Sequence, residues 1–188
     1  MTLRENNPYL YLAAIALMSW WLLKLTGLEA LYHGEAPAHS PDYFSKGYQK
    51  WEMNELGVVK NKLLGDELIH YSDDGTTHTL NPVLFFYNGN TPPWVIKSQT
   101  GLLSGDGKDL FLDGKVIIDR EEAKGVAPLT IITRALKVKP ETRYAETKAW
   151  TELISSSNKT TGTGMQLTFV QPIHLRLLAN VKGKYEKK

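Results

Sequence analysis

Five histidines are the side chains with which this 188-residue chain could most readily bind a metal or transfer a proton. No two of them have the H-E-x-x-H spacing of a metalloprotease site, and no two have the H-x-H spacing. His70 and His78 flank the turn Asp73-Asp74-Gly75, so a hairpin there would bring two imidazoles near two carboxylates. An ordinary surface hairpin is the alternative. The spacing leaves both open, and we predict no metal ion and no cofactor.

The remaining polar groups form no recognisable catalytic arrangement. Ser155-Ser156-Ser157 precedes Asn158-Lys159-Thr160 and has the composition of a loop, without the G-x-S-x-G nucleophile elbow. Gly162-Thr163-Gly164 lacks the Lys-Ser/Thr and the following helix of a phosphate loop. The chain has no cysteine, which excludes disulfides, thiolate metal sites and a Cys nucleophile. The sequence therefore predicts a protein that is not an enzyme.

Charge and composition exclude further classes. The chain has 22 Lys and Arg against 20 Asp and Glu, a net charge of +2, and its basic residues are scattered among acids. Nucleic-acid-binding proteins concentrate basic residues on one face, so no nucleic-acid partner is expected. The 42% of hydrophobic residues is enough for a packed core and too high for a disordered chain.

The N-terminal residues have the composition of a membrane anchor. Residues 6–23 (NNPYLYLAAIALMSWWLL) contain no charge, and apolar residues continue after Lys24 to Leu28. About 20 residues span a bilayer, so we predict an uncleaved single-span helix within residues 1–28. Its membrane-facing side chains are expected to be Leu10, Leu12, Ile15, Leu17, Trp20 and Trp21.

Two other interpretations of this segment compete with the anchor. A cleaved signal peptide would need small residues directly after the apolar stretch, whereas Ala36-Pro37-Ala38 lies well downstream. A helix buried in a soluble core would normally show a polar stripe, and none is present.

The rest of the chain predicts an all-β domain. Residues 29–40 are small and polar and form a linker, and residues 41–188 contain short apolar runs separated by turn residues. Alternate apolar residues occur at 110–118 and 173–181, typical of half-buried strands. The alternation changes phase between Ile131 and Leu136, which indicates a bulge. A membrane-tethered β domain with a large apolar interior suits two functions, a lipid carrier or a scaffold that pairs through its strand edges.

An ordered set of short motifs follows the N-terminal anchor. These are Pro41-Asp42-Tyr43-Phe44, Trp51-Glu52-Met53-Asn54, Gly57, Leu64, Leu68, His70-Tyr71, Asp73-Asp74-Gly75, Asn81-Pro82-Val83-Leu84, Trp94, 110–116 (LFLDGKV), Thr133, Leu136, Val138, Pro140, Gly162-Thr163-Gly164-Met165 and Val181-Lys182-Gly183-Lys184-Tyr185. In this order the features resemble those of the LptC family. No single piece is specific, but the ordered set covers most of the chain.

This resemblance implies a periplasmic, open β-jellyroll of antiparallel strands behind a single transmembrane helix. It implies an inner-membrane location, with the N-terminus in the cytoplasm and the C-terminal domain in the periplasm. The family's function is lipopolysaccharide transport in outer-membrane biogenesis: lipopolysaccharide passes from the LptB/LptF/LptG ABC transporter into the jellyroll and on to the bridge protein LptA. No nucleotide-binding motif occurs here, so ATP would be hydrolysed by the transporter.

Two sets of residues are expected to do this work. The lipid-binding groove is predicted on the apolar strand faces, at Met53, Leu68, Leu84, Phe86, Trp94, Ile96, Leu112, Val116, Leu167, Phe169, Leu175 and Leu177. The same residues could instead form an ordinary core, because groove and core share one face. The edge that docks LptA is predicted at Gln166, Thr168, His174, Arg176, Val181 and Tyr185. A scaffold that pairs strands without carrying lipid is the alternative function.

Overall fold

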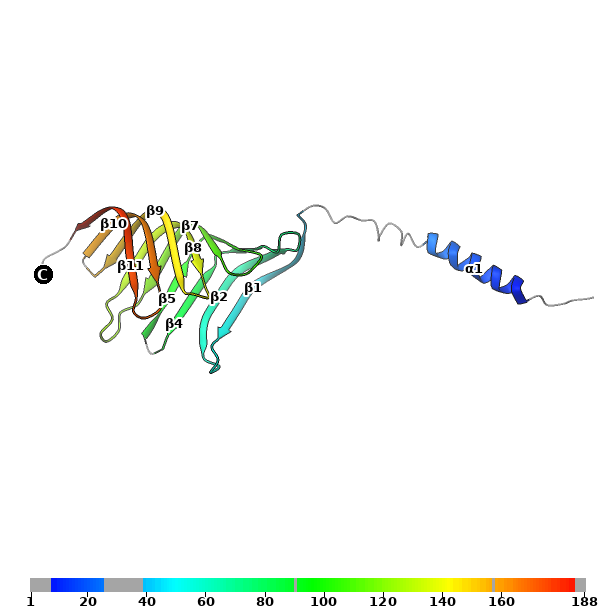
Figure 1. The fold of residues 1–188 in the computed structure, drawn as a ribbon, viewed down its shortest axis with the longest axis horizontal. Helices are drawn as coiled ribbons and strands as arrows, with labels where there is room; N and C mark the ends of the chain where they lie inside the picture. Colours follow the sequence, from blue (N-terminus) through cyan, green and yellow to red (C-terminus); the bar gives the residue numbers. More distant parts are fainter. Residues whose placement is uncertain (1–7, 26–38, 90, 157, 185–188) are drawn as a thin grey trace, which may run out of the picture. The chain divides into compact units, whose positions relative to one another are not determined.

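A computed structural model of the chain describes residues 8–25, 39–89, 91–156 and 158–184. The chain divides into two compact units, residues 1–38 and residues 39–188, which are described separately below. The first contains one helix and the second contains all the strands (Figure 1). The predicted linker at residues 29–40 lies almost wholly outside the described residues.

Helix α1 extends from Pro8 to Leu25 (Figure 1). Proline suits the first turn of a helix, and the basic Lys24 in the last turn favours the negative end of the helix dipole. The Lys24 amine also lies 5.3 Å from the centre of the Trp20 ring. The predicted helix is thus confirmed, and all six residues expected to face a membrane lie exposed on it.

The expected span of the membrane is not borne out. Among the described residues no helix combines the length and the apolar character needed to cross a bilayer. The 18 residues of α1 rise about 27 Å, whereas a span takes about 20 residues. The prediction counted residues 26–28 as part of the span, and these lie outside the described residues.

In the described part of the second unit, eleven antiparallel strands form one sheet, which confirms the all-β prediction (Figure 1). Their path is β11-β10-β9-β8-β7-β5-β4-β2-β3-β6, and β1 pairs with β2. The strands are β1 (Pro41–Met53), β2 (Val59–Tyr71), β3 (Thr77–Leu80), β4 (Val83–Asn88), β5 (Thr91–Lys97), β6 (Thr100–Leu103), β7 (Leu110–Arg120), β8 (Leu129–Lys139), β9 (Tyr144–Ser155), β10 (Asn158–Thr168) and β11 (His174–Lys184).

Two long strands, β2 and β7, each pair with two shorter strands along one edge. β2 pairs with β4 near its start and with β3 near its end, whereas β7 pairs first with β6 and then with β5. Since β4 also pairs with β5 and β3 with β6, two routes connect β2 to β7. The four short strands therefore lie as two successive pairs between β2 and β7, and β1 and β11 are the two edges of the described sheet.

A series of irregularities crosses the strands from β7 to β11. The pairing shifts register after Leu112 on β7 and after Ile132 on β8, and Gly114 and Ala135 there have φ of 77° and 48°. The next strands shift near Gly164, at a φ of 74°. The bulge predicted between Ile131 and Leu136 is therefore confirmed, as one of several that bend these strands.

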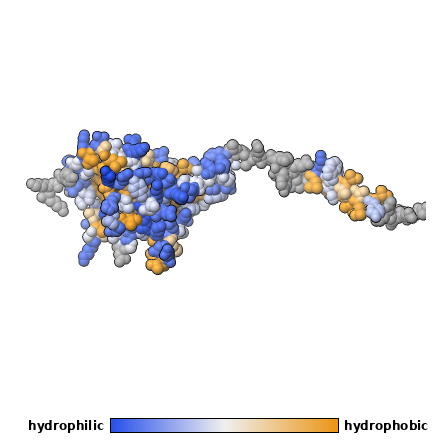
Figure 2. Space-filling model, in the orientation of Figure 1, coloured by the Kyte–Doolittle hydropathy of each residue, from blue (hydrophilic) through white to orange (hydrophobic). Residues whose placement is uncertain are grey.

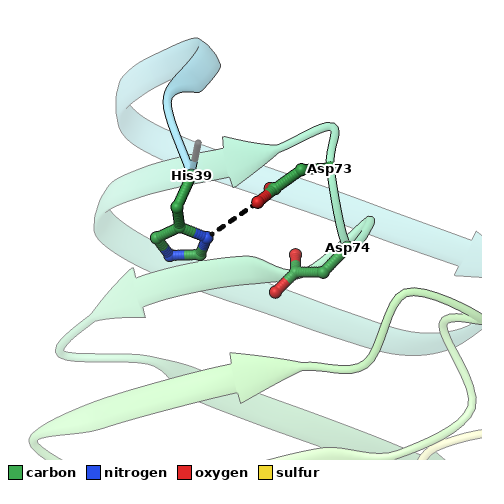
Figure 3. A group of neighbouring side chains, drawn as sticks. All are labelled: His39, Asp73 and Asp74. Carbon is green, nitrogen blue, oxygen red and sulfur yellow. Dashed lines mark hydrogen bonds and ion pairs between the residues drawn. The ribbon is translucent and has the colours of Figure 1, made fainter. Parts of the chain in front are cut away.

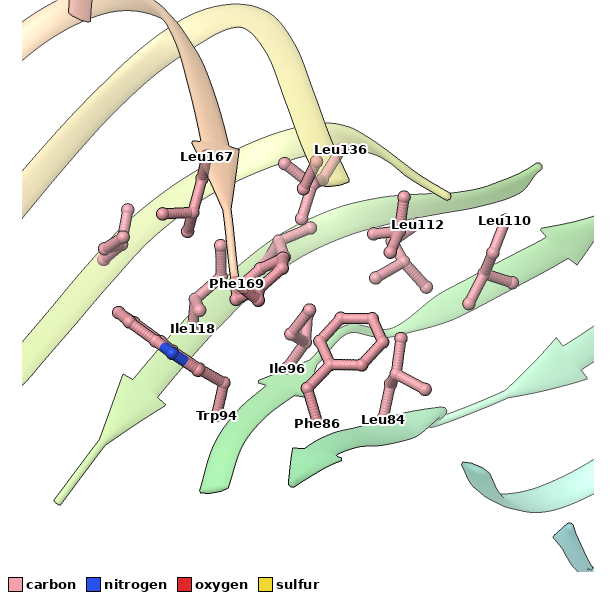
Figure 4. Packing of buried hydrophobic residues seen from close by; sticks show 14 of the residues in the cluster. Leu84, Phe86, Trp94, Ile96, Leu110, Leu112, Ile118, Leu136, Leu167 and Phe169 are labelled. Atoms are coloured by element: carbon pink, nitrogen blue, oxygen red, sulfur yellow. The ribbon is translucent and has the colours of Figure 1, made fainter. Parts of the chain in front are cut away.

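The core lies between inward-facing side chains of β4, β5 and β7 and those of β8 to β10. In Figure 4, Leu84 and Phe86 project toward the same space as Leu136 and Leu167 from strands across the core. Three aromatic rings fill one part of it: the Phe169 ring centre is 4.8 Å from that of Phe86 and 5.4 Å from that of Trp94. All three rings are fully buried.

A network of hydrogen bonds closes the core beside these rings. The Arg143 guanidinium, in the β8–β9 turn, donates to the Asn88 side chain at 2.8 Å and to the Lys60 carbonyl at 2.9 Å. Asn88 in turn donates to the Phe169 carbonyl at 2.6 Å. Burial lowers the pKa of Arg143, against an opposing effect of Glu52. The network ties β2, β4 and the chain after β10 together at this end.

Candidate functional site

A cavity of about 820 Å³ borders the core. Seven strands contribute to it, namely β3, β6, β7, β8, β9, β10 and β11. Its apolar lining consists of Leu102, Phe111, Leu112, Leu136, Met165 and Leu178. Leu112, Leu136 and Met165 also belong to the buried core, so the cavity is a continuation of the core that side chains do not fill.

Small residues form part of this wall. Gly101, Ala135 and Ala149 line the cavity. At Gly101 even a Cβ atom would lie 2.9 Å from a Thr79 methyl group and 3.3 Å from Leu112. Strand β6 therefore passes close to its neighbours only because it has no side chain at this position.

Charged groups of both signs line the same cavity. Asp113, Lys137, Glu146 and Lys148 contribute to the wall. The Lys137 amine is 2.9 Å from an Asp109 carboxylate oxygen and lies 5.3 Å from the centre of the Phe111 ring. An apolar interior with a few polar groups is typical of a site for an amphiphilic ligand.

The predicted groove residues divide between the cavity and the core. Only Leu112 lines the cavity, and Leu84 lines a smaller one of about 260 Å³. The fully buried members pack within the core: Phe86, Trp94, Ile96, Val116, Leu167 and Phe169. Leu175 and Leu177 pack against the core half-buried, Leu68 is buried outside this cluster, and Met53 is 59% exposed at the end of β1.

Sequence reasoning missed most of the cavity wall. Leu102, Leu136 and Met165 belong to the alternating apolar runs, so the signal for an inward-facing position was present. The exposed Leu178 had no such signal, because it follows Leu177 directly and breaks the alternation of β11. The alternation of apolar residues cannot distinguish an inward side chain that packs against another side chain from one that faces a cavity.

The predicted docking residues lie on two different strands. His174, Arg176 and Val181 are exposed on β11, which among the described strands pairs only with β10 and is an edge of the sheet. Gln166 and Thr168 lie on β10, whose backbone pairs with both β9 and β11 and is not at the edge. Gln166 lines the cavity instead. Tyr185 lies outside the described residues.

Hydrophobic side chains also gather on the surface. Figure 2 shows them along α1 and at the tip of the β1–β2 hairpin. The hairpin tip carries Met53, Leu56 and Val58, of which Leu56 is 86% exposed. None of these three hairpin residues lines the cavity.

The histidines at the β2–β3 turn are not arranged as a pair of ligands. His70 bonds through Nδ1 to the Thr77 hydroxyl at 2.9 Å and stacks on Tyr43. His78 packs edge-on against Tyr71 and lines the cavity. A third histidine, His39, approaches the two aspartates of the turn instead.

Comparison with known proteins decides the family. The family model described as "Lipopolysaccharide-assembly, LptC-related" matches residues 8–186. The chain belongs to this LptC family. The resemblance inferred from the ordered motifs is therefore confirmed, and membership makes the chain a component of lipopolysaccharide transport, in a family of transport proteins and not of enzymes. No curated protein sequence matches the chain.

Proposed function

We propose that this LptC-family protein carries lipopolysaccharide by taking acyl chains into the cavity between its strands. The observation that carries the proposal is the cavity of about 820 Å³, whose wall is mainly apolar and continuous with the core. Cavities of 300–1,000 Å³ are the usual size for small-molecule sites. Leu102, Leu112, Leu136, Met165 and Leu178 are the residues we assign to acyl-chain contact, in place of most of the groove residues chosen from the sequence.

The energetics explain why such a cavity suits transport. Each methylene removed from water contributes about 0.8 kcal/mol, so one chain of about 12 methylenes contributes about 10 kcal/mol. Release of that chain into the aqueous periplasm would cost the same amount. When a chain passes from one apolar cavity to another, the free energy changes only by the difference between the two sites. A small difference keeps each step reversible.

The direction of transfer follows from the partners implied by the family. Lipopolysaccharide would enter from the LptB/LptF/LptG transporter, which hydrolyses ATP, and leave to LptA. LptA would add its own strand to β11, whose free edge presents unpaired backbone groups. His174, Arg176 and Val181 are exposed on this strand and would contact the added one.

The apolar helix α1 is the part of the chain that we propose to hold it at the inner membrane, with the β unit in the periplasm. Its exposed leucines and tryptophans favour an apolar environment. Membrane extraction at alkaline pH should leave the protein in the pellet, and removal of residues 8–25 should release it. Protease access to an N-terminal tag in spheroplasts then distinguishes a helix that crosses the bilayer from one that lies on its surface.

A photo-crosslinking amino acid in place of Leu178 tests the carrier function, because Leu178 lines the cavity and is 49% exposed. In energised membranes we expect a lipopolysaccharide adduct at this position. The matched control is the same amino acid in place of Leu56, which is more exposed but does not line the cavity. Equal adducts at both positions, or none at Leu178, would contradict the carrier proposal.

The open edge of β11 favours a second function, a scaffold that joins the transporter to LptA. The cysteine-free chain permits a single-cysteine test with Val181→Cys on the edge strand. A thiol crosslinker should capture LptA at this position and not at a cysteine in place of Leu56. Capture of LptA without any lipopolysaccharide adduct at Leu178 would leave the scaffold as the function.

A further inference from the structure

Three potential metal ligands from distant parts of the chain meet where the β unit begins. His39 immediately precedes β1, and Asp73 and Asp74 lie in the turn between β2 and β3 (Figure 3). The His39 Nδ1 atom is 3.1 Å from the Asp73 Oδ2 atom. One ligand atom from each of the three residues lies within 4.8 Å of the others.

Neighbouring groups hold two of these side chains in place. The His39 ring is stacked on the Tyr71 ring, with centres 4.1 Å apart and planes 3° from parallel. The Asp74 Oδ1 atom accepts hydrogen bonds from the Thr76 amide at 2.8 Å and the Thr76 hydroxyl at 2.6 Å. Ligands oriented by such outer contacts lose less conformational freedom when they bind an ion.

We propose that His39, Asp73 and Asp74 bind a divalent transition-metal ion of the zinc class. The site would supply one imidazole nitrogen and two carboxylate oxygens, and water would complete the coordination. Zinc bonds to such ligands are 2.0–2.2 Å long, which places neighbouring ligand atoms about 3.4 Å apart in a tetrahedron. The separation of 3.1 Å between His39 and Asp73 is close to this value.

The ligand chemistry selects the class of ion. Imidazole nitrogen suits zinc, nickel, copper and iron, whereas magnesium and calcium prefer oxygen ligands alone. His70, one of the two histidines that flank the turn in the sequence, is instead bonded to Thr77 and stacked on Tyr43.

A bound ion would link two positions that are 34 residues apart in the sequence. It would fasten the residue through which the chain enters β1 to the β2–β3 turn. The site is separate from the acyl-chain residues assigned above, so its presence or absence leaves the carrier proposal unaffected.

Titration of the metal-free, detergent-purified full-length protein with zinc chloride tests the site by calorimetry. We expect binding that magnesium chloride does not reproduce, and at least about a tenfold loss of zinc affinity in His39→Asn and in Asp73→Asn. Asparagine is chosen at position 39 because it tolerates the φ of 63° there. His174→Asn removes an exposed histidine on β11 and should leave zinc affinity unchanged.

A second measurement is independent of substitution. In nuclear magnetic resonance spectra of the unsubstituted protein, zinc should shift the imidazole signals of His39 and leave those of His70 in place. Absence of zinc binding would overturn the proposal. Unchanged affinity in both site variants, or no shift at His39, would also overturn it and leave His39 and Asp73 as an ion pair only.

Discussion

Two parts of the β-unit interior, called here the aromatic end and the cavity end, differ in how the inward-facing side chains are used. The aromatic end is formed by Phe86, Trp94 and Phe169, whose rings pack against one another between the strands. The cavity end is lined in part by small residues such as Gly101 and Ala149 and contains about 820 Å³ of open space. Both ends are built from the same alternating strands. The size of the inward side chains therefore decides whether such a strand pair forms a core or a site.

Substitution of Trp94 should have the largest effect on stability. Trp94→Ala is expected to lower the free energy of unfolding by about 3–5 kcal/mol, because a fully buried ring leaves a large void. Met165→Ala at the cavity end should cost about 2 kcal/mol, since Met165 already borders open space. Urea unfolding measures both. Equal losses would mean that the cavity end is as closely packed as the aromatic end.

Filling the cavity should affect transport more than folding. Ala149→Phe places a ring in the open space and should lower stability by about 1 kcal/mol or less, because no existing side chain must move far. The lipopolysaccharide adduct at Leu178 should then largely disappear. Ala149→Ser is the matched control and should retain the adduct. An undiminished adduct in Ala149→Phe would mean that acyl chains do not enter this end.

The bulge at Gly114 lies on β7 between Leu112, which lines the cavity, and Val116, which does not. Gly114→Ala should cost about 2 kcal/mol, because φ is 77° and the new Cβ would lie 3.0 Å from the Gln99 Cβ. Gly107→Ala, at a φ of 71° with open space around it, should cost about 1 kcal/mol. Thermal unfolding compares them, and equal shifts would show that the contact with Gln99 contributes nothing.

The smallest effect is expected at Glu52, which lies outside both ends. Partial burial raises the pKa of its carboxyl, but hydrogen bonds from Asn61 and Lys60 outweigh this and lower the pKa overall. The resulting stabilisation is present above the ordinary pKa of a glutamate and is lost as the pH falls through the lowered value. Glu52→Gln should make stability between these two values less dependent on pH, measured by urea unfolding across the acid range. An unchanged pH profile would contradict this assignment.

Much of the fold was predictable from local patterns. The uncharged run before Lys24 forms α1, the alternation at 110–118 forms β7, and the change of phase before Leu136 is a bulge. Each of these depends on residues close together in the sequence. No helix among the described residues meets the requirements of a membrane span, and residues 26–28, which the prediction included, lie outside them.

The candidate site was predictable only in part. Alternation identified inward-facing positions such as Leu112 and Trp94, and both are buried. It did not show that Leu112 borders a cavity, whereas Trp94 packs against other side chains of the core. The same limit applies at the β2–β3 turn, where the spacing favoured His70 and the structure brings His39 to Asp73.

The sequence by itself determined the strands, the turns, the apolar helix and, through an ordered set of motifs, the family. These are properties of neighbouring residues and of their order. Tertiary structure alone decided which strand edge stays free, which inward faces enclose open space and which distant ligands converge. The physical reason is that these features depend on what lies across the sheet or beside the strand, and that partner is set by pairing between residues tens of positions apart.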